Sequence, residues 1–297
     1  MSLRRLTTAT LALAVSLLAS PAHADETARA PLDVAMEHLA QGRFPEALAA
    51  VEAVPADDPA AAKARYVVGE VQLALGDASA AEAAFRAALE KKPDAAPALA
   101  GLGRALLAQG KADEAVEPLS KAVGKDAASA RTRAWLGLAR SRAGKGDEGR
   151  KDLAAASKAA PADAEVARVA VEERLDAKDV EGAAKAAAAF GRAAKGSAMG
   201  PFLTAFVLDR AGKFDEAIAA YEKALSIDDR LLDAHKDLAI LCIAQNRVYT
   251  DTVRNAKAMK HFARYAELGG RDATVLSVYE SLKSFLGGSV SGDGSRR

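Results

Sequence analysis

The sequence predicts an all-α protein in which short helix-turn-helix units are stacked as a solenoid. Three observations lead to this prediction. Alanine is abundant and aromatic residues are only 5% of the 297 residues, which suits closely packed helices because alanine favours the helix and lets backbones approach. Runs of β-branched and aromatic residues bounded by turn residues, which indicate strands, are essentially missing. The third observation is a pattern that recurs every 34 residues.

The period is carried first by a series of glycines. A glycine ends the first helix of a unit well because it adopts the left-handed backbone conformation that side chains resist. We therefore expect a bend at each of these glycines, and Lys178 stands where the series lacks one. The glycines lie 34 residues apart, with a last step of two periods (212 − 144 = 68): Gly42, Gly76, Gly110, Gly144 and Gly212.

Two further positions keep the same register. Five residues after the bend comes a small residue, where the second helix crosses the first and leaves no room for bulk. One helical turn later, a residue on the same face fills the space between helices. Prolines then close some units, because proline cannot continue a helix. The small residues are Ala47, Ala81, Ala115, Gly149, Ala183 and Ala217, the residues one turn later are Val51, Phe85, Leu119, Leu153, Ala187 and Tyr221, and the prolines are Pro59, Pro93 and Pro161.

The units follow one another with two irregularities. Units one to five are expected within residues 25–197 and units six and seven within 198–271. The fifth unit keeps only the spacing and ends in a glycine-rich stretch, so it is either a loosely packed repeat or a hinge between two stacks. In the seventh unit the crossing residue, Ala258, comes late, so an insertion lengthens the loop or extends a helix. An amphipathic segment at 272–286 is expected to cap the stack, and 287–297 to form a flexible tail.

These markers resemble the tetratricopeptide repeat, which combines the spacing W-x2-L-G-x2-Y with A-x3-F and a closing proline. The matching residues of the second unit are Val68, Gly69, Ala81, Phe85 and Pro93. The family's first-helix tryptophan is missing from its usual place, and Trp135 lies two positions later. The resemblance implies a right-handed α-solenoid of six to seven repeats with a C-terminal capping helix. It also implies a groove on the concave side, built from the first helices.

The first residues have the pattern of a secretion signal. Arg4 and Arg5 precede an apolar stretch, and Ala22 and Ala24 form the A-x-A pattern that signal peptidase prefers. The apolar stretch is short for a membrane span, although a retained anchor is the alternative. We expect residues 1–24 to be removed and the protein to be periplasmic.

The charge balance argues against a nucleic-acid partner. Removal of the signal leaves 39 basic side chains (41 − 2) against 40 acidic ones. Proteins that bind nucleic acid need a concentrated basic face to displace counterions from phosphates, and a nearly neutral chain offers little of this. After cleavage we also expect no stable membrane insertion, because no later apolar segment is long enough to cross a bilayer.

The sequence contains no recognisable pattern of catalytic, cofactor-binding or metal-ligating residues. No CxxC, HExxH, nucleophile elbow or phosphate-binding loop is present. We expect His38 to pack in the interior, and His235 and His261 to lie on helix surfaces. Cys242, the only cysteine, is expected to be a small buried hydrophobe. The sequence therefore predicts a protein that is not an enzyme.

By analogy with the family, positions 2, 5, 9, 12 and 13 of each repeat face the concave groove. In the middle of the chain these positions hold four arginines, whose guanidinium groups can bind carboxylates or phosphates. Glu172 and Asp176 lie near them in the sequence, so the arginines either bind an acidic partner or pair internally. Two phenylalanines one turn apart form a candidate anchor pocket. The candidate groove residues are Lys63, Tyr66, Arg104, Arg131, Arg142, Arg168, Phe202 and Phe206.

Together these features predict an exported scaffold or adaptor that holds protein or peptide partners in its groove. Exported proteins of the resembled family often belong to envelope assemblies for pili, motility, secretion or polysaccharide export, and the resemblance implies such a role. The alternative is a structural protein that self-assembles through the ends of its stack. An enzyme or carbohydrate-binding protein would need convergent acid–base groups or an aromatic platform, and aromatic residues are scarce.

Overall fold

The computed structural model describes residues 30–244 and 251–291, and every regular element in these ranges is a helix. The predicted all-α fold is confirmed. The helices are α2 (Pro31–Ala40), α3 (Phe44–Glu52), α4 (Ala61–Leu75), α5 (Ala78–Lys91), α6 (Ala96–Ala108), α7 (Ala112–Lys125), α8 (Ala130–Arg142), α9 (Gly146–Ala159), α10 (Ala164–Asp176), α11 (Val180–Ala193), α12 (Met199–Arg210), α13 (Phe214–Ile227), α14 (Leu232–Ala244), α15 (Thr252–Glu267) and α16 (Ala273–Ser291). The expected signal at 1–24 lies outside the described residues.

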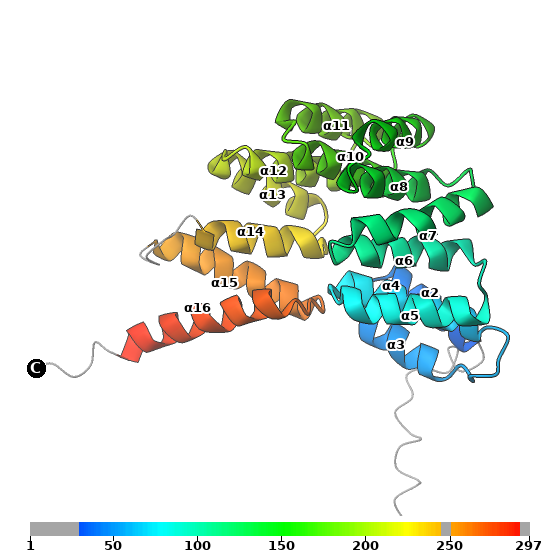
Figure 1. Cartoon of the computed structure of the whole chain (residues 1–297). Helices are drawn as coiled ribbons and strands as arrows, with labels where there is room; N and C mark the ends of the chain where they lie inside the picture. Colours follow the sequence, from blue (N-terminus) through cyan, green and yellow to red (C-terminus); the bar gives the residue numbers. More distant parts are fainter. Residues whose placement is uncertain (1–29, 245–250, 292–297) are drawn as a thin grey trace, which may run out of the picture.

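Consecutive helices pack as seven pairs, from α2 with α3 to α14 with α15, and α16 packs against α15 at the end of the stack (Figure 1). The stack is a solenoid because each pair contacts the next one along the chain. Helix α16 continues to Ser291, past the expected end of the capping segment at residue 286. The insertion expected in the seventh unit covers about residues 249–255. Residues 249 and 250 lie outside the described residues, Asp251 caps α15, and 252–255 form its first turn.

The bends between first and second helices lie where the 34-residue period places them. All five glycines of the series have a positive φ, between 69° at Gly42 and 87° at Gly76. Lys178 adopts the same conformation with a φ of 60°, and it is the only residue other than glycine with a positive φ in the described part of the chain. The backbone therefore bends at this position even where the sequence offers a side chain that disfavours the bend.

The crossing positions explain how closely each pair packs. The alanines of this series are completely buried, as is Ala258 in the seventh unit. One turn later, Phe85 of α5 is also completely buried, and its ring lies against Gly69 of α4 and Gly101 of α6. A Cβ atom at Gly101 would lie 2.4 Å from the Phe85 ring, so the glycines are needed for this close approach.

The stack curves with its first helices on the inside. First helices of neighbouring units contact each other from α2 through α12, whereas second helices of neighbouring units make at most sparse contacts among the described residues. This asymmetry bends the stack into an arch, and the first and last units approach each other (Figure 1). Arg230, before α14, donates to the carbonyl oxygen of Gln41, after α2, over 2.6 Å.

The buried apolar side chains of the described residues form three hydrophobic clusters rather than one. The first is built mainly on α2 to α4, the second on α5 to α10 and the third on α10 to α16. Helix α10 contributes to two of them, with Val166 and Val169 in the second cluster and Ala167 and Val171 in the third. The boundary between the second and third clusters therefore falls in the fifth unit. This is the unit for which the sequence left open a loosely packed repeat or a hinge.

Candidate partner groove

The concave face carries two hollows lined by first helices. The first, of about 280 Å³, extends from α4 to α10 and is lined by Tyr66, Arg104, Trp135 and Glu165 among others. The second, of about 360 Å³, extends from α8 to α12 and is lined by Arg142, Glu172, Asp176, Phe206 and Arg210 among others. We call this face, with both hollows, the concave groove.

Trp135 of α8 lines the first hollow and is otherwise buried in the second hydrophobic cluster. Its indole is 8% exposed and lies between two guanidinium groups, with Arg104 at 5.6 Å and Arg168 at 5.0 Å from the ring centroid. Its Nε1–H donates to Glu165 over 2.7 Å. Cation–π contacts and this hydrogen bond fix the ring orientation. The groove therefore presents rigid side chains before any partner binds.

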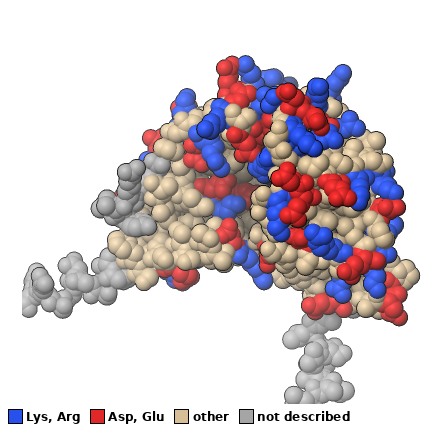
Figure 2. Space-filling model, in the orientation of Figure 1, with Lys and Arg blue, Asp and Glu red and all other residues tan. Residues whose placement is uncertain are grey.

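All four predicted arginines are paired with carboxylates of the same groove. Arg104 donates to Glu70 at 3.0 Å, Arg131 to Asp163 at 2.7 Å, and Arg168 to Glu172 at 3.3 Å. Arg142 donates to Glu172 at 2.6 Å and to Asp176 at 2.8 Å. This is the internal pairing that the sequence left open. Basic and acidic side chains are accordingly interspersed on the face shown in Figure 2.

The pairing has consequences for ionisation. Burial would lower the pKa of Arg104, but the carboxylates of Glu70 and Glu165 outweigh it and raise that pKa. Burial, reinforced by Glu70, raises the pKa of Tyr66 to about 12, so its hydroxyl stays protonated and remains a hydrogen-bond donor. The groove keeps these charges and donors across the physiological pH range.

The predicted aromatic anchor pocket is only half formed, and the prediction for Phe202 is wrong. Phe202 is 5% exposed and meets the edge of Tyr221 from α13, with ring centroids 5.9 Å apart. Phe202 belongs to the interior, in the same hydrophobic cluster as Tyr221. Phe206 does line the second hollow, where the guanidinium of Arg210 lies 5.3 Å from its ring centroid. Lys63 is exposed on α4, outside both hollows.

Trp135 and Glu165 were missed as groove residues by the repeat-position rule. A usable signal was present, because Trp135 is the only tryptophan and stands close to one period from both Arg104 (135 − 104 = 31) and Arg168 (168 − 135 = 33). First-helix residues at this spacing come to lie side by side on neighbouring units.

The prediction that His235 and His261 lie on helix surfaces is wrong. They are 2% and 8% exposed, and their Nδ1 atoms are 2.8 Å apart across α14 and α15. Nε2 of His235 lies 2.9 Å from the carbonyl oxygen of Asp229, so Nε2 carries a proton and, in the neutral pair, Nδ1 of His235 accepts from His261. Burial, assisted by His235, lowers the pKa of His261 to about 4. This pair joins the two helices of the seventh unit.

Two other sequence predictions hold. Cys242 and His38 are both buried, with exposed fractions of 0% and 5%. Burial raises the pKa of the Cys242 thiol, which disfavours the reactive thiolate. Among the described helices, none combines the length and the apolar character needed to cross a bilayer.

Comparison with known proteins identifies the family. Sequence profiles of the tetratricopeptide repeat match residues 32–96, 69–130 and 205–230. The chain belongs to the tetratricopeptide repeat family, and its fold is that of a scaffold for protein–protein interaction. No curated protein sequence matches the chain.

Solved structures with a similar fold have very different sequences. A tetratricopeptide repeat protein from Parabacteroides merdae superposes with a TM-score of 0.54 at 11% identity, over 85% of this chain and 97% of that one. A chain of the Cut9–Hcn1 hetero-tetramer of the APC/C superposes with a TM-score of 0.52 at 14% identity. The match covers 84% of this chain but only 48% of that chain. PilW, described as a type IV pilus biogenesis factor, superposes with a TM-score of 0.51 at 19% identity. The match covers 66% of this chain and 91% of PilW. At these identities the likeness shows the fold alone.

Proposed function

We propose that the protein is an exported adaptor that holds protein partners in its concave groove within a bacterial envelope assembly. The observation that carries the binding role is the preformed first hollow, where Trp135 is fixed between Arg104 and Arg168 beside Glu165. A tryptophan and arginines held rigidly at a concave surface are the residue types that dominate binding energy at protein interfaces. They lose little conformational entropy when a partner docks.

The charge pattern of the groove favours a partner of mixed charge. The four arginines face five groove carboxylates within ion-pair distance: Glu70, Asp163, Glu165, Glu172 and Asp176. An acidic ligand alone would meet no excess of positive charge here. A partner segment with both positive and negative side chains can form ion pairs with these arginines and carboxylates, so that no buried charge is left unmatched.

Support for export comes from the sequence of the first 24 residues, which has the composition and cleavage pattern of a signal peptide. The envelope role draws on the family resemblance, and PilW shows that the fold occurs in a pilus biogenesis factor. Export is tested by mass spectrometry of the protein from a periplasmic fraction, with an N-terminus at Asp25 as the expected result.

Partner binding is tested by photocrosslinking in cells. A photoreactive phenylalanine analogue replaces Tyr66 or Phe206 in the groove, or the 71%-exposed Val253 on α15 as the control position. We expect the same proteins to crosslink from both groove positions and not from 253, and Trp135→Phe to weaken the crosslinks at 66. If the only crosslinks are between copies of this chain, the protein self-assembles and is not an adaptor. If all three positions crosslink equally, the concave groove is not the binding surface.

A further inference from the structure

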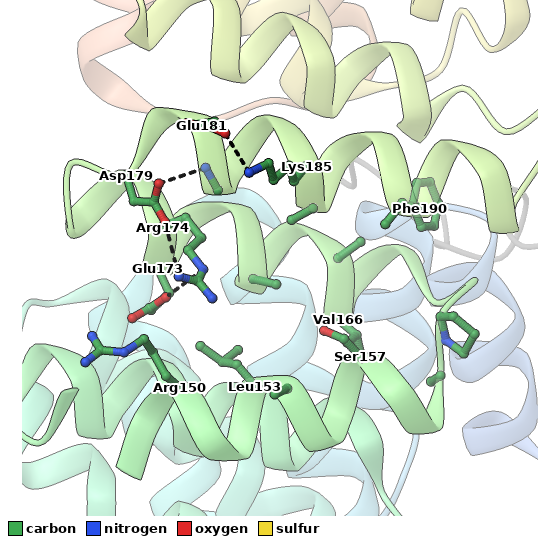
Figure 3. A pocket seen from close by; sticks show the side chains of 18 residues that line it. Arg150, Leu153, Ser157, Val166, Glu173, Arg174, Asp179, Glu181, Lys185 and Phe190 are labelled. Atoms are coloured by element: carbon green, nitrogen blue, oxygen red, sulfur yellow. Dashed lines mark hydrogen bonds and ion pairs between the residues drawn. The ribbon is translucent and has the colours of Figure 1, made fainter. Parts of the chain in front are cut away.

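A second concave site lies on the outer side of the solenoid, between the fourth and fifth units. It is a cleft of about 540 Å³ lined by α9, α10 and α11 (Figure 3). Its volume falls in the range of about 300–1,000 Å³ that is typical of ligand sites. Helix α10 borders both the concave groove and the outer cleft, but no lining residue is shared between them, so the outer cleft is a separate surface.

The outer cleft exists because α9 is drawn toward α8 and away from its next neighbours. Gly137 of α8 and Gly149 of α9 face each other, and a Cβ atom at Gly149 would lie 2.4 Å from the Gly137 carbonyl oxygen. Two glycines thus allow backbone-to-backbone approach on this side. Helix α9 packs more extensively on α8 than on α10, and a gap remains in front of α11.

The walls of the outer cleft are apolar and its polar end holds a buried carboxylate. Leu153, Val166 and Phe190 line it from three different helices. Glu173 of α10 is 3% exposed, and its Oε1 accepts from the hydroxyl of Ser141 over 3.1 Å. Its Oε2 is 3.8 Å from Nε of Arg174, which is too long for a hydrogen bond.

The cations around the outer cleft are already engaged by other carboxylates. Arg174 donates to Asp179 at 3.1 Å, and Lys185 and Arg150 pair with Glu181 and Asp147. Among the carboxylates that line the cleft, only Glu173 lacks a close cation of its own. Its nearest cation, Arg174, pairs more closely with Asp179. A buried carboxylate in this situation is stabilised by a further cation that donates to it.

We propose that the outer cleft binds a segment of a second protein partner that carries a lysine or arginine next to aliphatic side chains. The cation donates to Oε2 of Glu173, and the aliphatic groups pack on Leu153, Val166 and Phe190. Charge complementarity selects this occupant over an acidic or purely apolar one. The protein would then hold two partners at once, one in the concave groove and one on the outer side.

The test uses the purified full chain and four fluorescein-labelled nonapeptides, identical except for a central lysine, arginine, norleucine or glutamate between leucines. Fluorescence anisotropy is expected to show binding of the lysine and arginine peptides at least tenfold tighter than the other two. Glu173→Gln keeps an acceptor for Ser141 but removes the charge, so it should abolish this preference.

Two further variants separate the outer cleft from the rest of the molecule. Ala186 lines the outer cleft, whereas Ala184 is exposed on the same helix and does not. Ala186→Phe should fill the cleft and remove binding, while Ala184→Phe should leave it unchanged. The proposal is wrong if no peptide binds, if the glutamate peptide binds as well as the lysine peptide, or if binding survives Ala186→Phe. Photocrosslinks at positions 66 and 206 report on the concave groove independently, and Ala186→Phe should leave them intact.

Discussion

The junction between the second and third units differs from the junction between the fourth and fifth. At the first, Phe85 is enclosed by Gly69 on one side and Gly101 on the other. At the second, Leu153 faces Gly137 on one side but the outer cleft on the other. The same repeat position therefore makes a closed contact in one place and an open one in the other. A regular repeat pattern fixes where helices bend, and the residues on the next unit decide how tightly units pack.

The largest expected effect is at the closed junction. Phe85→Ala removes a completely buried ring from between two units and leaves a cavity that glycines cannot fill. We expect a loss of about 3–5 kcal/mol in the free energy of unfolding, measured by chemical denaturation. A loss below about 1 kcal/mol would mean that the two units are not held together by this ring.

A smaller loss is expected at the open junction. Leu153→Ala should cost about 2 kcal/mol, at the low end for buried leucine, because one side of Leu153 already borders the outer cleft. The same denaturation experiment gives the comparison. If Leu153→Ala destabilises as much as Phe85→Ala, the two junctions are equally packed and the contrast is wrong.

The third prediction concerns pH and the seventh unit. The pKa of His261 is lowered to about 4 from an ordinary 6.5, so between these values the unfolded chain binds more protons than the folded one. Stability contributed by this residue is therefore present above pH 6.5 and is lost as the pH falls toward 4. We expect the Tm to decrease by a few degrees over this window.

The His261 measurement needs a difference between variants. Burial raises the pKa of Asp237 to about 7, and a carboxyl with a raised pKa acts in the opposite sense over the same pH range. Comparing the wild type with His261→Gln isolates the histidine. A Tm difference between the two proteins that does not change from pH 7 to pH 4 would contradict the buried histidine pair.

The smallest effect is expected at the irregular bend. Lys178 occupies the left-handed conformation that glycine adopts at the other bends, at a cost of about 1–2 kcal/mol to a residue with a side chain. Lys178→Gly should therefore stabilise the protein by about 0.5–1 kcal/mol, after subtracting the larger entropy of glycine in the unfolded chain. Gly144→Lys is the matched reverse change and should destabilise. A destabilised Lys178→Gly variant would show that the lysine side chain makes a contact worth more than the strain.

The sequence was most informative where a feature recurs. The bends from Gly42 to Gly212, the substitute at Lys178 and the buried crossing alanines follow from a period and from local backbone chemistry. Internal pairing of the arginines was one of the two outcomes that the sequence left open. The pairs form because charged side chains at similar repeat positions on adjacent units meet when the units stack. The position rule failed at Phe202, since the partner that buries it, Tyr221, comes from another helix.

Features that occur once were not predictable. His235 and His261 are 26 residues apart and separated by an insertion that breaks the period, so no spacing indicates their contact. The outer cleft depends on the combination of Gly137 and Gly149, which come together only in the folded protein. Single tertiary contacts of this kind depend on packing geometry that a repeat pattern does not encode.

Native-state hydrogen exchange tests the contrast between the two junctions most directly. Helices α5, α7 and α11 occupy equivalent places in their units, but only α11 borders the outer cleft. We predict that the slowest amides of α11 exchange markedly faster than those of α5 and α7, because fewer packed side chains hold this helix. Equal protection of all three helices would contradict the account.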